Sequence, residues 1–464
     1  MKLRLAALWL VLFAVYASTL GLDSFDSSDY GGDEPHYLLT AKSLAEDGDF
    51  DVRNQRFDRE WEEFYPERLD RHGKLTGGRA HEPHGAGFPT LIAPAFALGG
   101  AKAVELLLAA IAALGGVLAY LLALRVVPDP WALGATLAVA LSPPFLAYGS
   151  AVYPELAAAT ALAGAALLAL RLEERITRKA AAGCCLLLGT LPWLGTKFVP
   201  AGLVIGVYAA RVIWRARNRT LALLTTELAL FSVVFYVTLN EALYDGPTPY
   251  SADVEGETAT DASFPGGYLD RAYRLIALMI DREYGLLRWA PVFVLAGVGL
   301  WMLARTRGEG LRRVLPEHGR AESAALLCAL ALAAQLLVAA FLAPTMFGFW
   351  FPPRHLLAGL LLAVPLVAWG LRRAPRTGAA LALAGIVASA WLYADVRWGG
   401  GGLAAGRPDA PWGPLEDVFP LFDDGNTGAY VVAGALAGVL AGLCLLAWRH
   451  SRQSAGATRA KYSG

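Results

Sequence analysis

The sequence predicts an all-α protein that crosses a membrane many times. Of its 464 residues, 56% are hydrophobic and only 17% are charged, whereas soluble domains average about 25% charged residues. The apolar residues fall in runs of about 20, the length that an α-helix needs to cross a bilayer. Glycine and proline are abundant, as they are in membrane helices. A single integral membrane domain over residues 1–464 is therefore expected.

Twelve apolar segments are candidate membrane spans. They are 3–20, 101–124, 131–149, 152–171, 180–196, 198–214, 221–240, 288–304, 322–342, 355–371, 378–394 and 429–448. The first is interpreted as a retained span, although the small residues of "YAS" also leave a cleaved signal peptide open. Residues 87–99 are too short to span, carry two prolines and end in Gly-Gly. We expect a half-buried juxtamembrane helix there.

The charges divide between the two sides of this layout. With the N-terminus inside, the inner loops and the basic tail at 449–464 hold 23 of the 40 Lys and Arg residues. The outer segments, together with Glu155, hold 32 of the 40 acids. These segments are 21–100, 241–287, 343–354 and 395–428. Since positive residues are retained in the cytoplasm, we expect a cell inner or plasma membrane protein with both termini cytoplasmic.

Several function classes find no support in the sequence. There is no P-loop and no G-x-G-x-x-G fingerprint. The inner loops are too short for a nucleotide-sugar domain, and nothing points to nucleic acid. Cys184, Cys185, Cys328 and Cys444 lie in apolar runs, so neither a disulfide framework nor a cysteine metal site is expected. Any chemistry is expected on the acidic outer face.

The first outer loop opens with "GGDEPHYLLTAKSLAEDGDFD". From Glu34 onward, apolar residues recur on one helical face and polar residues on the other, which predicts an amphipathic helix of about three turns lying on the membrane. Pro35 suits its first turn and Gly48 its end. Asp33 then occupies the N-cap. It is either a simple cap, worth about 1 kcal/mol, or a catalytic carboxylate held at the bilayer surface.

These features resemble the GT-C glycosyltransferases, most closely the branch of the protein O-mannosyltransferases and lipid A aminoarabinose transferases. The resemblance rests on the first span, the loop that opens with Asp33 and Glu34, the Gly-Asp turn at 48–49, and the layout of spans. It implies a GT-C-like bundle with juxtamembrane helices on its outer face. In that family the first acid is the catalytic carboxylate, which corresponds to Asp33, and Glu34 is its motif partner.

The resemblance also implies a reaction. Such an enzyme would move a sugar, with inversion, from a polyprenyl-phosphate donor in the membrane lipid to an extracytoplasmic lipid, glycan or protein. A carboxylate would remove the proton of the acceptor. The lipid phosphate would leave as an anion, so it needs cations rather than a general acid.

Polar residues near the outer ends of the spans are candidate substrate ligands. Glu155 lies at the start of its span and is either a sugar or acceptor ligand or a hydrated interface residue. Lys197 and Arg354 are candidates for the lipid phosphate, although Lys197 could equally extend to lipid headgroups. His355 accompanies Arg354.

Three further candidates lie elsewhere on the outer side. Tyr284 and Arg288, in "LIALMIDREYGLLRWAPVF", could contact phosphate or sugar, or could form a charged helix edge. His84 stands in "HEPHGAGFP", whose spacing matches no zinc signature. No cofactor is therefore expected, although some relatives of the resembled family bind divalent ions.

Two other functions remain open at this stage. A secondary transporter or lipid flippase would carry ionisable groups in the middle of its spans. The acids away from the span ends are Glu105 and Glu227, and neither has an evident partner. A non-catalytic protein of the same fold is the third possibility, against which the intact Asp33-Glu34 pair argues.

Overall fold

The computed structural model describes residues 1–25, 28–252, 267–309, 316–343, 354–403, 418–422, 427–442 and 445. These residues are overwhelmingly helical, and one short hairpin of strands β1 (Leu75–Thr76) and β2 (Arg79–Ala80) is the sheet that they form. The predicted all-α class is confirmed. Two of the predicted outer segments extend beyond these ranges: most of 343–354 and much of 395–428 lie outside the described residues.

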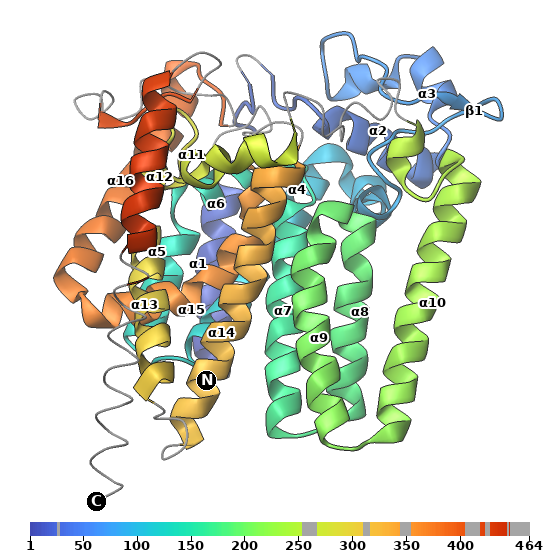
Figure 1. The fold of residues 1–464 in the computed structure, drawn as a ribbon. Coiled ribbons are helices and arrows are strands. Elements are labelled where there is room, and N and C mark those ends of the chain that lie inside the picture. Colours follow the sequence, from blue (N-terminus) through green and yellow to red (C-terminus); the bar gives the residue numbers. More distant parts are fainter. Residues whose placement is uncertain are drawn as a thin grey trace, which may run out of the picture.

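The long helices form a bundle that places the outer-loop elements at one end (Figure 1). The bundle helices are α1 (Lys2–Ala17), α4 (Gly87–Ala123), α5 (Trp131–Ala140), α7 (Glu155–Glu174), α8 (Arg178–Leu194), α9 (Val199–Arg215), α10 (Arg219–Tyr244), α13 (Val294–Glu309), α14 (Pro316–Leu337), α15 (Leu357–Arg373) and α16 (Pro375–Gly399). A further apolar helix covers Thr427–Gly442.

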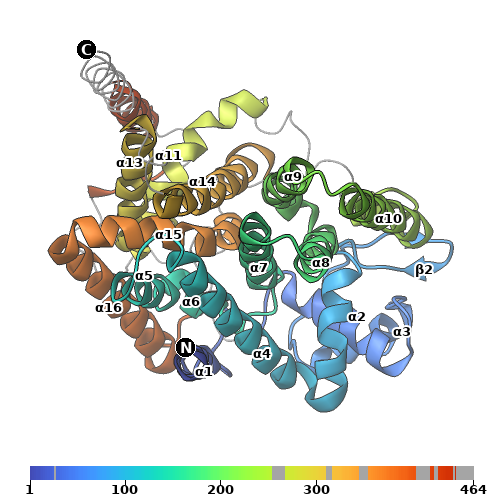
Figure 2. The same cartoon turned by 90° about the horizontal axis from the view of Figure 1, so that it is seen from below.

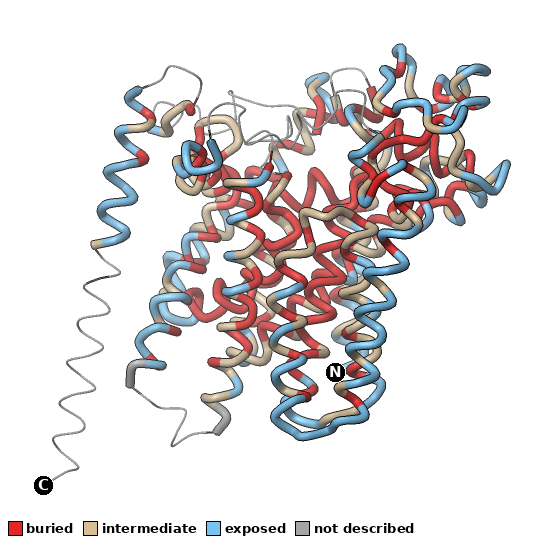
Figure 3. The backbone as a smooth tube through the Cα atoms, turned by 45° about the vertical axis from the view of Figure 1, so that its right-hand side comes forward, coloured by how far each residue is buried: buried red, intermediate tan, exposed pale blue. Residues whose placement is uncertain are grey.

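Helix α15 is the centre of the bundle, where it packs against α4, α5, α7, α13 and α14 (Figure 2). Glycines let the backbones approach closely: a Cβ at Gly299 would lie 2.2 Å from the carbonyl oxygen of Leu366, and one at Gly370 would lie 2.2 Å from that of Leu295. Small residues at helix contacts are typical of membrane bundles. Burial follows the same plan, with a buried centre and exposed outer helices (Figure 3).

Helix α10 lies at the edge of the bundle and packs against α8 and α9. Most of its apolar side chains are exposed, among them Phe231 and Phe235. An apolar helix with so little protein cover is suited to lipid contact.

The predicted count of twelve spans is not confirmed. In the part of the chain that is described, seven helices are long and apolar enough to cross a membrane. Helix α1 has 16 residues and ends at Ala17, three residues before the predicted end. The predicted span at 429–448 is described only in part.

Two predicted spans are wrong as continuous helices because each is broken before a proline. Span 131–149 divides into α5 and α6 (Pro143–Tyr148), with Ser142 in an extended conformation. Span 288–304 divides into α12 (Leu286–Trp289), a 3₁₀ turn η6 (Pro291–Phe293) and α13. A residue before proline is disfavoured in the α region, which explains both breaks.

The outer end of the bundle is built from short elements of several parts of the chain (Figure 1). They are α2 (Glu34–Glu46), α3 (Arg53–Phe57), η1 (Glu60–Glu63), the hairpin, η2 (Thr196–Phe198), η3 (Pro249–Ala252), η5 (Tyr268–Tyr273), α11 (Arg274–Ile280), α12 and η9 (Arg354–Leu356). A π-helical turn, η8 (Val338–Leu342), ends α14.

Helix α2 begins and ends as the sequence predicts, with Pro35 in its first turn and a positive φ at Gly48. One expectation is wrong: the polar face is not solvated. His36, Thr40 and Ser43 are buried, because the rest of the outer loop packs over them.

The segment at 87–99 is a separate helix, as predicted. The backbone leaves the helical conformation at Gly99 and Gly100, so α4 is kinked between its first part and the long part that packs against α1 and α7. Gly100 has φ +62°, which favours glycine at this position.

We expect the end of the bundle that carries α2 to face away from the cytoplasm. In a cysteine-free background, a membrane-impermeant maleimide added to intact cells should label Glu67→Cys, an exposed residue of the outer loop. Arg175→Cys, exposed between α7 and α8, should be labelled only after lysis. The reverse pattern would contradict the charge-based orientation.

Candidate active site

Asp33 lies directly before α2, but its side chain does not cap the helix. Its Oδ2 atom instead accepts a hydrogen bond of 2.8 Å from Nη2 of Arg354, a residue 321 positions away in the sequence. The side chain of Asp33 remains 26% exposed, whereas that of Arg354 is 8% exposed. The cap interpretation therefore fails, and Asp33 belongs to a tertiary cluster of charges.

Glu155 completes this cluster from the first turn of α7. Its Oε1 atom accepts hydrogen bonds from Nε of Arg354 and Nζ of Lys197, each at 2.7 Å. Glu155 is fully buried, so its charge depends on these two cations. The hydrated interface alternative for Glu155 is therefore wrong. Glu155 Oε2 has no hydrogen-bond partner among the described residues and can accept one from a ligand.

An aromatic side chain supports the cations. The guanidinium of Arg354 lies 4.1 Å from the ring centre of Tyr153, which is a cation–π contact. The Tyr153 hydroxyl donates 2.9 Å to the carbonyl of Gly31, two residues before Asp33. Tyr153 thus positions both Arg354 and the chain segment that carries Asp33.

Glu34 holds the same segment in place but does not enter the charge cluster. Its carboxylate accepts hydrogen bonds from the backbone N–H groups of Gly31 (3.0 Å) and Val152 (2.8 Å). Burial raises the pKa of Glu34 to about 7, although these two backbone donors oppose the shift. Its contacts are those of a positioning residue.

The basicity of Asp33 is strongly reduced by its surroundings. Burial alone would raise its pKa, but the charge of Arg354 and its hydrogen bond hold the pKa of Asp33 well below its usual range. Asp33 is therefore ionised at every physiological pH, and it is a weak base as long as Arg354 is bound to it.

The remaining predicted residues fall into two places. His355 is next to the cluster, where its Nε2 is buried without a hydrogen-bond partner among the described residues. Arg288 is buried against Trp289, and Tyr284 follows Asp281 in the same turn, where Asp281 accepts from the Tyr284 N–H.

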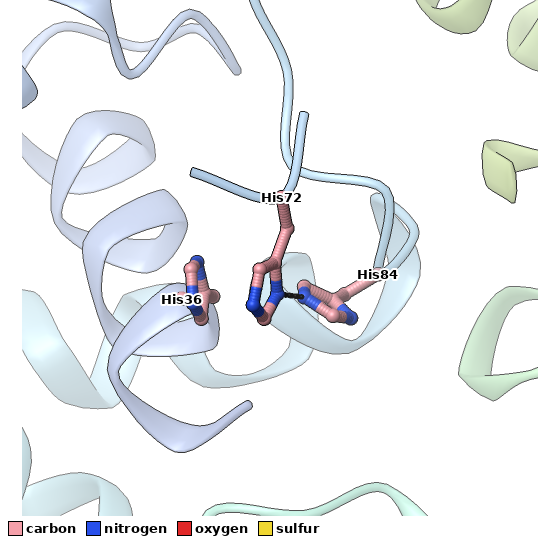
Figure 4. Close-up of side chains that lie close together, drawn as sticks. All are labelled: His36, His72 and His84. Atoms are coloured by element: carbon pink, nitrogen blue, oxygen red, sulfur yellow. Dashed lines mark hydrogen bonds between the residues drawn. The ribbon is translucent and has the colours of Figure 1, made fainter. Parts of the chain in front are cut away.

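His84 lies in a group of three imidazoles with His36 and His72 (Figure 4). Burial lowers the pKa of His84 to about 4 despite the opposing charge of Asp33, so its ring is neutral. His36 and His72 were not among the predicted site residues. Neither was Tyr153, although its place two residues before Glu155 in "VYPE" was a usable signal.

Neither a family model nor a curated protein matches this chain. Among solved structures, the chain is similar to ArnT from Cupriavidus metallidurans. The apo state matches with a TM-score of 0.54 and 18% identity over 97% of this chain and 74% of that one. The structure bound to undecaprenyl phosphate matches with a TM-score of 0.50 and 16% identity over 98% and 73%. The chain has the GT-C fold.

The GT-C fold explains why the cluster lies where it does. Asp33, Glu155, Lys197 and Arg354 come from α2, α7, η2 and η9, which meet at one end of the bundle. Each residue follows or precedes a helix that packs against α15 or α4. The bundle thus brings together four charges that are far apart in the sequence.

The pKa of Glu34 gives a testable pH dependence. Its folded value of about 7 is above its ordinary value of 4.5, so the folded state favours the neutral form. The stabilisation is complete below about pH 4.5 and is lost as the pH rises through 7, a change of about 3 kcal/mol. Thermal unfolding in detergent should show wild type losing stability between pH 5 and 8 more steeply than Glu34→Gln. Glu67→Gln, on the exposed surface, should keep the wild-type slope, and equal slopes in all three proteins would contradict the assignment.

Proposed function

We propose that this chain is an inverting glycosyltransferase that transfers a sugar from a polyprenyl-phosphate donor to an extracytoplasmic acceptor, with Asp33 as the catalytic base. The observation that carries the proposal is the pairing of Arg354 with both Asp33 and Glu155. It places a carboxylate with partial solvent exposure beside two cations. The fold shared with ArnT, which binds undecaprenyl phosphate, supports the class of donor.

Each charge has a role in the transfer. Asp33 takes the proton of the acceptor hydroxyl as its oxygen forms a bond to the anomeric carbon. The bond between that carbon and the phosphate oxygen breaks at the same time, and the lipid phosphate leaves with the electron pair. Arg354 and Lys197 stabilise the charge that develops on this phosphate. The free Oε2 of Glu155 accepts a hydrogen bond from a sugar hydroxyl.

The low basicity of Asp33 is reconciled with this role by competition for Arg354. A lipid phosphate carries negative charge and accepts bidentate hydrogen bonds from a guanidinium. When Arg354 turns toward the phosphate, Asp33 loses the partner that most stabilises its ionised form. Its pKa then rises toward the ordinary range. Donor binding would therefore activate the base.

A transporter is less well supported than a transferase. Glu105, which was expected to lack a partner, is paired with Lys102 at 3.1 Å and accepts a hydrogen bond from Tyr30. These contacts join α4 to the outer loop. They give Glu105 a structural role. Among the described residues, no chain of paired ionisable groups connects Glu105 to Glu227.

Replacing Asp33 by Asn should abolish transfer while preserving the fold. Loss of a positioned general base costs about 10²–10⁴-fold in rate, so kcat should fall by at least about 100-fold in proteoliposomes supplied with polyprenyl-phosphate sugars. Asp29→Asn is the matched control, because Asp29 is an acid of the same loop that pairs with Lys102 at 2.9 Å. Transfer by Asp33→Asn at the rate of the Asp29→Asn protein would remove Asp33 as the base.

Replacing Arg354 by Lys should weaken donor binding. Lysine keeps the charge but loses the planar fork, and a charge-assisted hydrogen bond contributes about 1.5–3 kcal/mol. The Kd for undecaprenyl phosphate should therefore rise by about 10–100-fold, measured by titration in detergent. Arg372→Lys, at the exposed far end of α15, should bind like wild type. An unchanged Kd for Arg354→Lys would exclude a phosphate contact.

A further inference from the structure

Three histidines from separate segments of the outer loop meet at one point (Figure 4). His36 comes from α2, His72 from the turn before β1, and His84 from the segment before α4. A ring nitrogen of each lies within 4.8 Å of those of the other two.

The spacing of the three rings suits a transition metal. A tetrahedral zinc site has Zn–N distances of about 2.0–2.1 Å, which puts its nitrogen ligands about 3.3 Å apart. Here Nδ1 of His72 and Nε2 of His84 are 2.9 Å apart, and the rings of His36 and His72 stack with centres 4.0 Å apart. The His72–His84 nitrogen pair is closer together than the ligands of a zinc ion, and one nitrogen of each ring lies within 4.8 Å of the others, so the rings would have to rotate apart to admit an ion.

A buried carboxylate orients one of the rings. Glu82 Oε2 lies 3.0 Å from Nδ1 of His36, and both side chains are almost fully buried. The other oxygen of Glu82 accepts two hydrogen bonds from Arg56, at 2.9 and 2.6 Å. A carboxylate on the far nitrogen of a ligating histidine is the usual second layer of a zinc site, because it fixes the tautomer and strengthens the ligand.

Arg56 extends this second layer to the segment that carries His72. Its guanidinium also donates to the carbonyl oxygen of Asp70 at 3.0 Å, two residues before His72. One connected set of hydrogen bonds therefore fixes both His36 and the backbone near His72. Packing of the three rings alone would not require such a network.

We propose that His36, His72 and His84 bind one divalent transition metal ion of the zinc class, with Glu82 as the outer partner of His36. Three imidazole ligands leave a fourth position for water or for an oxygen of a ligand. His36 is one helical turn from Asp33, so the ion would place positive charge beside that carboxylate. The proposal replaces the expectation of no metal and stands independently of glycosyl transfer.

Metal content tests this proposal directly. The full chain is purified without a histidine tag, stripped with a chelator, incubated with Zn²⁺ and desalted, and its zinc is measured by mass spectrometry. Wild type should retain about one ion per chain and should unfold at a higher temperature with zinc than without it. His72→Gln should lose at least about 80% of this zinc, since one of three ligands is removed.

His318→Gln is the control, because His318 lies at the start of α14, where it pairs with Glu322. This protein should retain zinc like wild type. A second measurement on wild type covers the case in which His72→Gln does not fold: Co²⁺ added to the stripped protein should give the visible absorption of a four-coordinate site. Wild type that retains no zinc and gives no such spectrum, or equal zinc in folded His72→Gln and wild type, would overturn the proposal.

Discussion

The contact on which the outer end of this molecule depends is the guanidinium of Arg354 between two carboxylates. It joins Asp33 at 2.8 Å and Glu155 at 2.7 Å, and Lys197 supplies the second cation to Glu155. A fully buried carboxylate without partners would be very costly. The cluster therefore holds α2, α7, η2 and η9 together. If one of these elements moved away, a buried charge would lose its partner.

Around this cluster, the loop that precedes α2 is fixed by groups that do not take part in the proposed chemistry. Glu34 accepts hydrogen bonds from two backbone N–H groups, those of Gly31 and Val152, and so joins these two segments. Tyr153 donates to Gly31 and also stacks under Arg354. Preorganisation of this kind keeps a catalytic group within a few tenths of an ångström of its working position. The bundle itself supplies rigidity through the close backbone contacts of α13 and α15.

Local patterns predicted the elements better than their contacts. The start and end of α2 followed from Pro35 and Gly48, and the separate helix at 87–99 followed from its Gly-Gly end. Glu155, Lys197 and Arg354 were predicted from their positions at span ends, and Asp33 from the start of the amphipathic helix and the family resemblance. Their pairing was not, because it joins residues up to 321 positions apart and depends on how α7 and α15 pack.

The errors have physical causes of the same kind. Hydropathy treats 131–149 and 288–304 as continuous because it scores apolar residues and ignores the restriction that Pro143 and Pro291 place on the residue before them. The polar face of α2 was expected in water because amphipathicity implies two environments. Here the second environment is protein: Glu82 and Arg56 supply partners for His36. The partners of such a buried polar face lie outside the helix. The periodicity of the helix sequence therefore cannot predict them.

Asp33 thus has two neighbours that bear on its charge, Arg354 and the histidine group. Arg354 holds a fixed positive charge that no physiological pH removes. His36 and His84 also lie close enough to influence Asp33, but the histidine group would carry a lasting charge only with a bound cation. A carboxylate with two such neighbours binds protons poorly until one neighbour is drawn away. Of the two, only Arg354 is bonded to Glu155, whose second oxygen has no partner among the described residues. A ligand that binds to Arg354 and Glu155 would restore basicity to Asp33. An ion at the histidines would instead keep the carboxylate oriented. Under the proposed function, proton removal by Asp33 would then depend on the presence of the donor.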